Sequence, residues 1–179
     1  RHHEEFGKGH VPGTLNINLD GSFAVWVGTL IEDLNAPILI IAPEGREEEM
    51  TLRLARVGYD NSAGYLEGGF PAWEQSGKEV AKIDSISASD LQAEFGNDIQ
   101  VVDIRKCSEY DAGHVEGAKN WQLNAINTWK NDLDPDQKLY IHCQTGYRSM
   151  SASSILRAHG FKNFVNVLGG IEAIKKTEI

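Results

Sequence analysis

The sequence has only two cysteines in 179 residues, too few for a disulfide framework. We therefore expect a reducing compartment, the cytoplasm. No apolar run approaches the roughly 18 residues of a membrane-spanning helix, and no signal-peptide pattern opens the chain, so no membrane partner is expected. Positive charge is also scarce, since 17 Lys and Arg face 26 Asp and Glu. The resulting net charge of −9 argues against a nucleic-acid partner.

What the sequence does contain is an internal repeat. Residues 6–13 (FGKGHVPG) recur as residues 110–117 (YDAGHVEG), 104 positions later. Residues 66–73 (LEGGFPAW) recur as residues 167–174 (VLGGIEAI), 101 positions later. The small drift between the two offsets is what loop insertions and deletions would produce. The chain is therefore predicted to contain two copies of one fold.

The first copy is expected to lack the element that opens the second. At the first offset Arg1 lies opposite Arg105, so nothing in the chain corresponds to the strand and aspartate at residues 101–103. A parallel sheet without that strand has an unpaired edge. We therefore expect the chain to be a fragment of a longer protein, with material upstream of Arg1.

Strands and helices are predicted to alternate along each copy. Residues 38–41 (ILII) form a continuous apolar run, which is typical of a strand buried on both faces, and residues 139–141 match it. This predicts an α/β fold with two domains, residues 1–80 and 85–179, each a mostly parallel sheet flanked by helices. A polar linker is expected at residues 78–85.

Helix signals accompany these strands. Ser87 or Ser89 is expected to cap a helix that carries Leu91 on its inner face. In the second copy a helix is expected from about Ser149 to Gly160.

One cysteine of the second copy has a reactive setting. Cys143 follows the strand at residues 139–141 and precedes the helix that is expected near Ser149. A helix N-terminus presents unpaired N–H groups and a positive dipole end, which favour anions and lower the pKa of a thiol. Gly146 permits the positive φ of a curled loop, and Arg148 adds a fixed cation. We therefore predict that Cys143 is a nucleophile.

The loop length bears on the chemistry. Cys143-x4-Arg148 is one residue shorter than the Cys-x5-Arg loop in which cysteine phosphatases hold phosphate, so its cradle suits one sulfur atom better. We assign catalytic roles to Cys143 and Arg148. The residues assigned to substrate binding are Gln144, Thr145, Gly146, Tyr147 and Ser149. Two alternatives stay open: a phosphatase or arsenate reductase of similar fold, and a non-catalytic docking module.

The first copy carries a loop without a nucleophile, residues 42–49 (APEGREEE). Aligning Gly45 with Gly146 puts Ala42 opposite Cys143, and a shift of one residue puts Pro43 there. Neither side chain is nucleophilic, and the glutamates that follow oppose an anion. The first copy is therefore expected to be catalytically inactive.

Other polar residues are assigned structural roles. Asp103 and Arg105 are expected to form an ion pair or to anchor a loop. His10 of the first copy and His114 of the second stand at equivalent positions of the repeat. Because the copy without a nucleophile keeps its histidine, both are expected to serve the fold. Cys107 is either a resolving thiol or an incidental cysteine, and the second interpretation is favoured. No metal ligands are assigned.

In combination these motifs resemble the rhodanese family of sulfurtransferases. The motifs that carry the resemblance are Asp103-x-Arg105, Glu109-Tyr110-x-x-Gly113-His114-Val115-x-Gly117-Ala118, Cys143-x-x-Gly146-x-Arg148 and Gly169-Gly170. The resemblance implies that Cys143 takes a sulfane sulfur from thiosulfate or a low-molecular-weight persulfide. It then passes this sulfur to a thiol, sulfite or cyanide acceptor through a covalent intermediate.

An inactive unit followed by an active one is similar to the C-terminal part of metallo-β-lactamase–rhodanese fusion proteins. In that family the upstream domain is an iron-dependent persulfide dioxygenase. The resemblance implies an upstream metallo-β-lactamase-type domain as partner, iron within that domain, and no cofactor in the present chain. The oligomeric state is left open.

Overall fold

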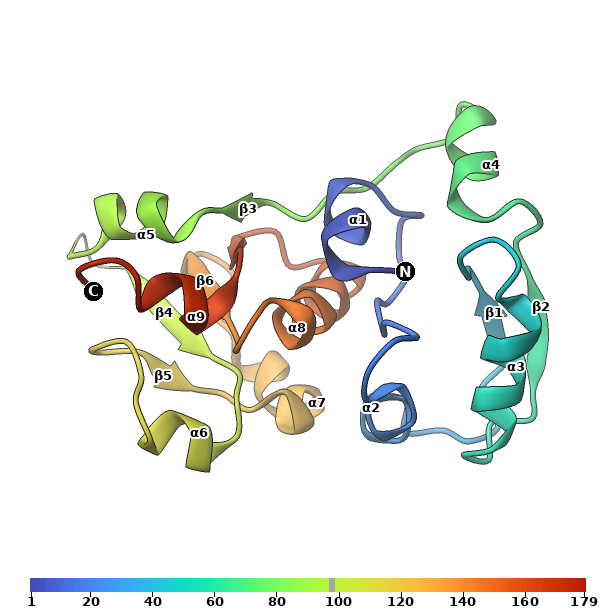
Figure 1. Ribbon diagram of the computed structural model, residues 1–179, viewed down its shortest axis with the longest axis horizontal. Coiled ribbons are helices and arrows are strands. Elements are labelled where there is room, and N and C mark those ends of the chain that lie inside the picture. The colour runs from blue at the N-terminus through green and yellow to red at the C-terminus, as the bar shows by residue number, and fades with distance from the viewer. Residues whose placement is uncertain (97–98) are drawn as a thin grey trace.

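A computed structural model describes residues 1–96 and 99–179, which form two sheets with helices around them (Figure 1). The strands are β1 (Ile38–Ile40), β2 (Ser62–Tyr65), β3 (Ser85–Ile86), β4 (Gln100–Asp103), β5 (Lys119–Asn120), β6 (Leu139–His142) and β7 (Phe164–Val167). The α-helices are α1 (His3–Lys8), α2 (Phe23–Leu30), α3 (Glu47–Ala55), α4 (Gly69–Gln75), α5 (Ala88–Glu94), α6 (Cys107–Asp111), α7 (Ile126–Trp129), α8 (Tyr147–Ala158) and α9 (Gly170–Ile174). Two 3₁₀ turns, η1 (Leu123–Ala125) and η2 (Lys130–Asp132), flank α7. Every strand pair is parallel, so the predicted α/β fold is confirmed.

The five-stranded sheet belongs to the second half and has the order β3-β7-β6-β4-β5. Successive side chains of its central strands point to opposite faces. Tyr140 packs with α5 and α9, whereas Ile141 packs with α8 and α7. The sheet is therefore covered on both sides, and Cys143 follows directly at the carboxyl end of a central strand. That edge is where ligands bind in open α/β sheets.

The first half contributes a smaller sheet, β1 paired with β2. Its strand at residues 38–41 was expected to be buried on both faces, and this expectation is wrong. Ile40 is buried, but Leu39 is 77% exposed. The reason is that only one face of this two-stranded sheet packs against the core.

A cavity of about 410 Å³ lies between β1 and residues 13–17 of the first half. In the second half the corresponding place, between β6 and β5, is filled by β4. In the described part of the chain no strand occupies that position in the first half. The predicted lack of an opening strand is thus visible as a gap beside β1.

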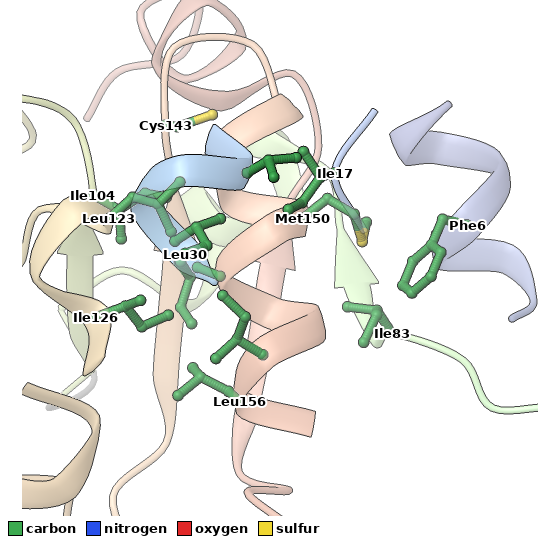
Figure 2. Close-up of a cluster of buried hydrophobic side chains, with 14 of the residues drawn as sticks. Phe6, Ile17, Leu30, Ile83, Ile104, Leu123, Ile126, Cys143, Met150 and Leu156 are labelled. Carbon is green, nitrogen blue, oxygen red and sulfur yellow. The ribbon is translucent and has the colours of Figure 1, made fainter. Parts of the chain in front are cut away.

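One of the two hydrophobic clusters of the described residues is shared by both halves, and the other belongs to the second half alone. Helices α1 and α2 stand between the two sheets in Figure 1, and α1 packs against α8. Figure 2 shows Phe6, Ile17 and Leu30 in the same cluster as Ile104, Leu123, Met150 and Leu156 of the second half. The division into domains at residues 1–80 and 85–179 stays a prediction.

The connection between the halves is anchored. Ala81 and His10 exchange two backbone hydrogen bonds of 2.9 Å. Ile83 is buried, and its N–H donates to the carbonyl of Gly7 at 3.0 Å. The prediction of a polar linker at residues 78–85 is therefore wrong at these positions, because part of the segment packs against α1.

Local signals explain where the helices begin. The hydroxyl of Ser87 accepts from the N–H of Asp90 at 3.1 Å, so Ser87 rather than Ser89 caps α5. Helix α8 begins at Tyr147, earlier than predicted, because Gly146 takes φ +118° at the cap position. In the described residues no helix is long and apolar enough to span a bilayer.

Candidate active site

The sulfur of Cys143 lies at the start of the loop that joins β6 to α8. The residue is only 1% exposed, and the N–H of Gly146 donates to Sγ at 3.2 Å. The sequence predicted several N–H donors around the sulfur; within the described residues, the structure shows this one contact to the thiol. Helix α8 begins at Tyr147, so the N–H groups of its first turn, which have no partner within the helix, follow this loop directly.

The N-terminus of α9 fixes the backbone of this loop. The N–H of Ile171 donates to the carbonyl of Cys143 at 2.8 Å. Gly170 has φ +57°, and a Cβ there would lie 2.5 Å from that same carbonyl oxygen. The approach of α9 to the loop therefore requires glycine at this position.

The same junction identifies the counterpart of Cys143 in the first half. A Cβ on Gly69 would lie 3.1 Å from the carbonyl oxygen of Ala42, as one on Gly170 would approach Cys143. Of the two alignments that the sequence left open, this geometry selects Ala42 rather than Pro43. The loop of the first half thus has a methyl group where the second half has a thiol.

Arg148, the cation that the sequence placed beside the thiol, is paired with a carboxylate. Its Nη1 and Nη2 donate to Oε2 and Oε1 of Glu109, on α6, at 2.6 and 2.8 Å. The bonds from Arg148 lower the pKa of Glu109 to about 2 and raise that of the Arg148 guanidinium. Sequence reasoning missed this role of Glu109, although the residue stands in the motif that includes Tyr110 and His114.

Asp103 and Arg105 form a buried ion pair behind the loop. Nη2 of Arg105 lies 2.6 Å from Oδ2 of Asp103, and both side chains are almost fully buried. The same guanidinium donates to the carbonyl of Gly113 at 2.8 Å and to Oε1 of Gln144 at 3.3 Å. The pair therefore connects the loop to the segment after α6.

His142 is fully buried beside this ion pair. Burial holds the pKa of the imidazole below its usual value. Its Nε2 makes no hydrogen bond within the described residues and lies 3.9 Å from Oδ2 of Asp103. A neutral imidazole that packs in the core fits this environment better than a proton carrier does.

Three residues that were assigned to substrate binding differ in their surroundings. Thr145 is exposed at the tip of the loop. The hydroxyl of Tyr147 donates to the carbonyl of Asn18 at 3.1 Å, and burial raises the pKa of Tyr147 to about 12. The hydroxyl of Ser149 is buried and donates to the carbonyl of Gly146 at 3.1 Å. Tyr147 and Ser149 thus hold the loop in place, and Tyr147 ties it to the first half.

The two repeated histidines make the same contacts in both halves. His10 stacks on Phe6 with ring centroids 4.1 Å apart, and His114 stacks on Tyr110 at 3.7 Å. In each pair the histidine Nδ1 lies within 3.1 Å of the carbonyl oxygen four residues earlier. The shared geometry shows that these side chains brace the turn after a short helix.

Cys107 lies at the exposed start of α6. Its Sγ is 3.6 Å from Oδ2 of Asp111, and that carboxylate raises the pKa of the thiol. A raised pKa reduces the thiolate fraction at neutral pH. In residues 1–96 and 99–179, no group of three or more His, Cys, Asp or Glu side chains is placed to hold a metal ion.

A cleft of about 660 Å³ opens beside the Cys143 loop, between the two halves. Trp26 and Thr29 of α2 line one wall. Lys106, Glu109 and Arg148 line the other. The first half therefore contributes to the surroundings of the loop even though its own loop has no nucleophile.

Comparison with known proteins agrees with this architecture. The family model of the rhodanese-like domain matches residues 1–76 and 87–177. The chain is 34% identical over 73 residues to the uncharacterized protein YqhL of Bacillus subtilis, covering 41% of this chain and 58% of that protein. The chain thus spans little more than half the length of that relative.

Two further relatives align with this chain over a larger share of their own length. The thiosulfate sulfurtransferase GlpE of Pseudomonas entomophila is 32% identical over 99 residues, which are 55% of this chain and 88% of that enzyme. The solved structure of a rhodanese-related protein from Thermoplasma volcanium aligns at 29% identity with a TM-score of 0.49. That alignment covers 52% of this chain and 91% of the other.

Proposed function

The chain belongs to the family of rhodanese-like domains, and from this premise we propose that it is a sulfurtransferase that works through a persulfide on Cys143. The observation that carries the proposal is the loop geometry. A thiol stands at the carboxyl end of β6, accepts the N–H of Gly146 at 3.2 Å, and is followed by a helix start that carries Arg148. The similarity to a thiosulfate sulfurtransferase supports the same chemistry.

The reaction that we propose has two displacements. In the first, the Cys143 thiolate attacks the outer sulfur of thiosulfate, a new S–S bond forms, and sulfite leaves with the electrons of the bond that breaks. A persulfide donor loses its outer sulfur in the same way and leaves as a thiolate. In the second, a thiol, sulfite or cyanide attacks the outer sulfur, and the Cys143 thiolate leaves. Backbone N–H groups of residues 144–148 stabilise the intermediate, together with the guanidinium of Arg148, whose charge Glu109 offsets.

The first half has a supporting role in this proposal. Ala42 occupies the position of Cys143, so the first half forms no persulfide of its own. Its α2 instead lines the cleft beside the loop. A phosphatase remains the second candidate, but a six-residue loop offers a smaller cradle than phosphate needs.

Steady-state kinetics tests the proposal. With thiosulfate and cyanide we expect thiocyanate to form with parallel double-reciprocal plots, which are the mark of a substituted-enzyme mechanism. Cys143→Ser should abolish turnover, whereas Cys107→Ser should retain it. Hydrolysis of an aryl phosphate by a wild type that forms no thiocyanate would favour the phosphatase instead.

We also propose that the protein works in the cytoplasm with a metallo-β-lactamase-type domain that holds iron and oxidises persulfides. The support is the resemblance of an inactive and an active unit in tandem to such fusion proteins. The test is the sequence of the full-length gene. A His-x-His-x-Asp-His motif in the same polypeptide would support the partnership, and a full-length protein without it would contradict it.

A further inference from the structure

Two of the three charged side chains that line the cleft beside the Cys143 loop, Glu109 and Arg148, neutralise each other. The third is Lys106. Both terminal nitrogens of Arg148 are occupied by the two carboxylate oxygens of Glu109, in a bidentate pair with side chains 16% and 31% exposed. Arg148 and Glu109 together therefore present no net charge to an incoming donor.

A doubly charged donor meets a cost at this site. To bind a dianion, Arg148 must leave a bidentate partner, and the carboxylate of Glu109 then faces the dianion without a counter-ion. A donor with a single charge, or one whose charge is spread over an organic group, meets less repulsion. The cleft of about 660 Å³ with Trp26 on its wall leaves room for such an organic group.

We propose that Glu109 is a specificity-determining residue that pairs with Arg148 and biases the site toward singly charged organic donors over dianionic ones. The inference rests on the proposed sulfurtransferase function and adds the charge class of the donor. Glu109 acts on the donor through Arg148 and through its own negative charge in the cleft. It has no part in forming or breaking the S–S bonds.

Glu109 also has a structural contact, so the test must keep that contact. Its Oε2 accepts the N–H of Lys106 at 3.2 Å, at the start of α6. Glutamine has the same length and serves equally well at this capping position. Glu109→Gln therefore removes the charge and the ion pair while it keeps the cap.

The experiment compares two donors with cyanide as the acceptor. Thiosulfate is a dianion, and benzenethiosulfonate is a monoanion that gives up its outer sulfur and leaves as a sulfinate. In Glu109→Gln we expect kcat/KM for thiosulfate to rise by about five- to tenfold relative to kcat/KM for benzenethiosulfonate.

Glu116→Gln is the matched control. Glu116 is exposed on the same half and lies outside the cleft lining, and its substitution changes the net charge by the same amount. We expect no change in the ratio of the two kcat/KM values. An equal rise in this control would assign the effect to the overall charge of the protein and overturn the role of Glu109.

Two further outcomes would also contradict the proposal. A uniform loss of kcat for both donors in Glu109→Gln would show that Glu109 only supports the fold of the loop. An unchanged donor ratio in a fully active variant would show that the charge is not used for selection. A wild type that forms no Cys143 persulfide with either donor would instead refute the proposed function, and the inference with it.

Discussion

At the residue scale, the surroundings of Cys143 are fixed by contacts that leave little freedom to the loop. Its carbonyl accepts from Ile171, its sulfur accepts from Gly146, and the Asp103–Arg105 pair reaches the neighbouring Gln144. Such preorganisation means that the donors are already in place when charge develops on sulfur. The buried ion pair is the part of this arrangement whose loss costs most.

Asp103→Ala should destabilise the protein strongly. It leaves Arg105 buried without its counter-ion, which typically costs about 3–5 kcal/mol. Asp84→Ala provides the control, because Asp84 pairs with Arg157 at 3.1 Å but its side chain is 71% exposed. An exposed pair contributes about 1 kcal/mol or less. Urea unfolding monitored by circular dichroism measures both losses, and equal losses would refute the assigned importance of the buried pair.

Acid should weaken the contribution of the Glu109–Arg148 pair. The pKa of Glu109 is lowered from 4.5 to about 2. A carboxyl group with a lowered pKa stabilises the folded state above its unfolded pKa and loses that contribution as the pH falls through the folded value. The difference in free energy of unfolding between wild type and Glu109→Gln should therefore shrink from pH 4.5 to pH 2. A gap that stays constant across this window, measured by urea titration, would contradict the assigned pairing.

At the element scale, the site depends on three elements meeting at one edge of the sheet. Strand β6 delivers the thiol, α8 begins within the loop, and α9 approaches so closely that a side chain at Gly170 would collide with the backbone. The same meeting of elements recurs in the first half around Gly69. The glycine pair at the start of α9 is therefore a packing requirement of the fold as well as a mark of the family.

Gly170→Ala should destabilise the protein by about 3 kcal/mol or more, because backbone atoms cannot move aside easily and φ is positive. Gly117→Ala is the matched control. It also has positive φ, at +75°, but a Cβ there would meet nothing within 4 Å, so about 1 kcal/mol is expected. Thermal unfolding of the two variants compares these losses, and equal shifts would argue against the close approach of α9.

The sequence predicted much of this arrangement and missed parts of it for physical reasons. The Cys143 loop and the repeat were visible because both depend on local patterns of residues. The partner of Arg148 was not, since Glu109 is 39 positions away and a contact between two elements leaves no local signal. The exposure of Leu39 was missed because an apolar run does not show how many faces of its sheet are covered.

At the scale of the whole molecule, the two halves depend on each other. Phe6, Phe23 and Leu30 of the first half pack in one cluster with Ile141 and Met150 of the second. A core shared in this way couples the unfolding of the parts that line it. The half without a nucleophile thus stabilises the half that has one.

Phe6→Ala should lower the stability of both halves together by about 3–5 kcal/mol. Native-state hydrogen exchange with mass spectrometry is the measurement, and peptides from β6 should lose protection along with peptides from α2. Leu39→Ala is the control, because Leu39 is 77% exposed. It should change the stability of either half by less than about 0.5 kcal/mol. Loss of protection confined to the first half would show that the halves unfold independently.

The central claim is that Cys143 carries a sulfane sulfur, and intact-protein mass spectrometry tests it most directly. After incubation with thiosulfate and removal of the excess, the wild type should gain the mass of one sulfur atom, and added cyanide should remove it. Cys107→Ser should gain the same mass, whereas Cys143→Ser should gain none. An adduct that persists in Cys143→Ser, or a wild type that forms none with thiosulfate or an organic persulfide, would contradict the account.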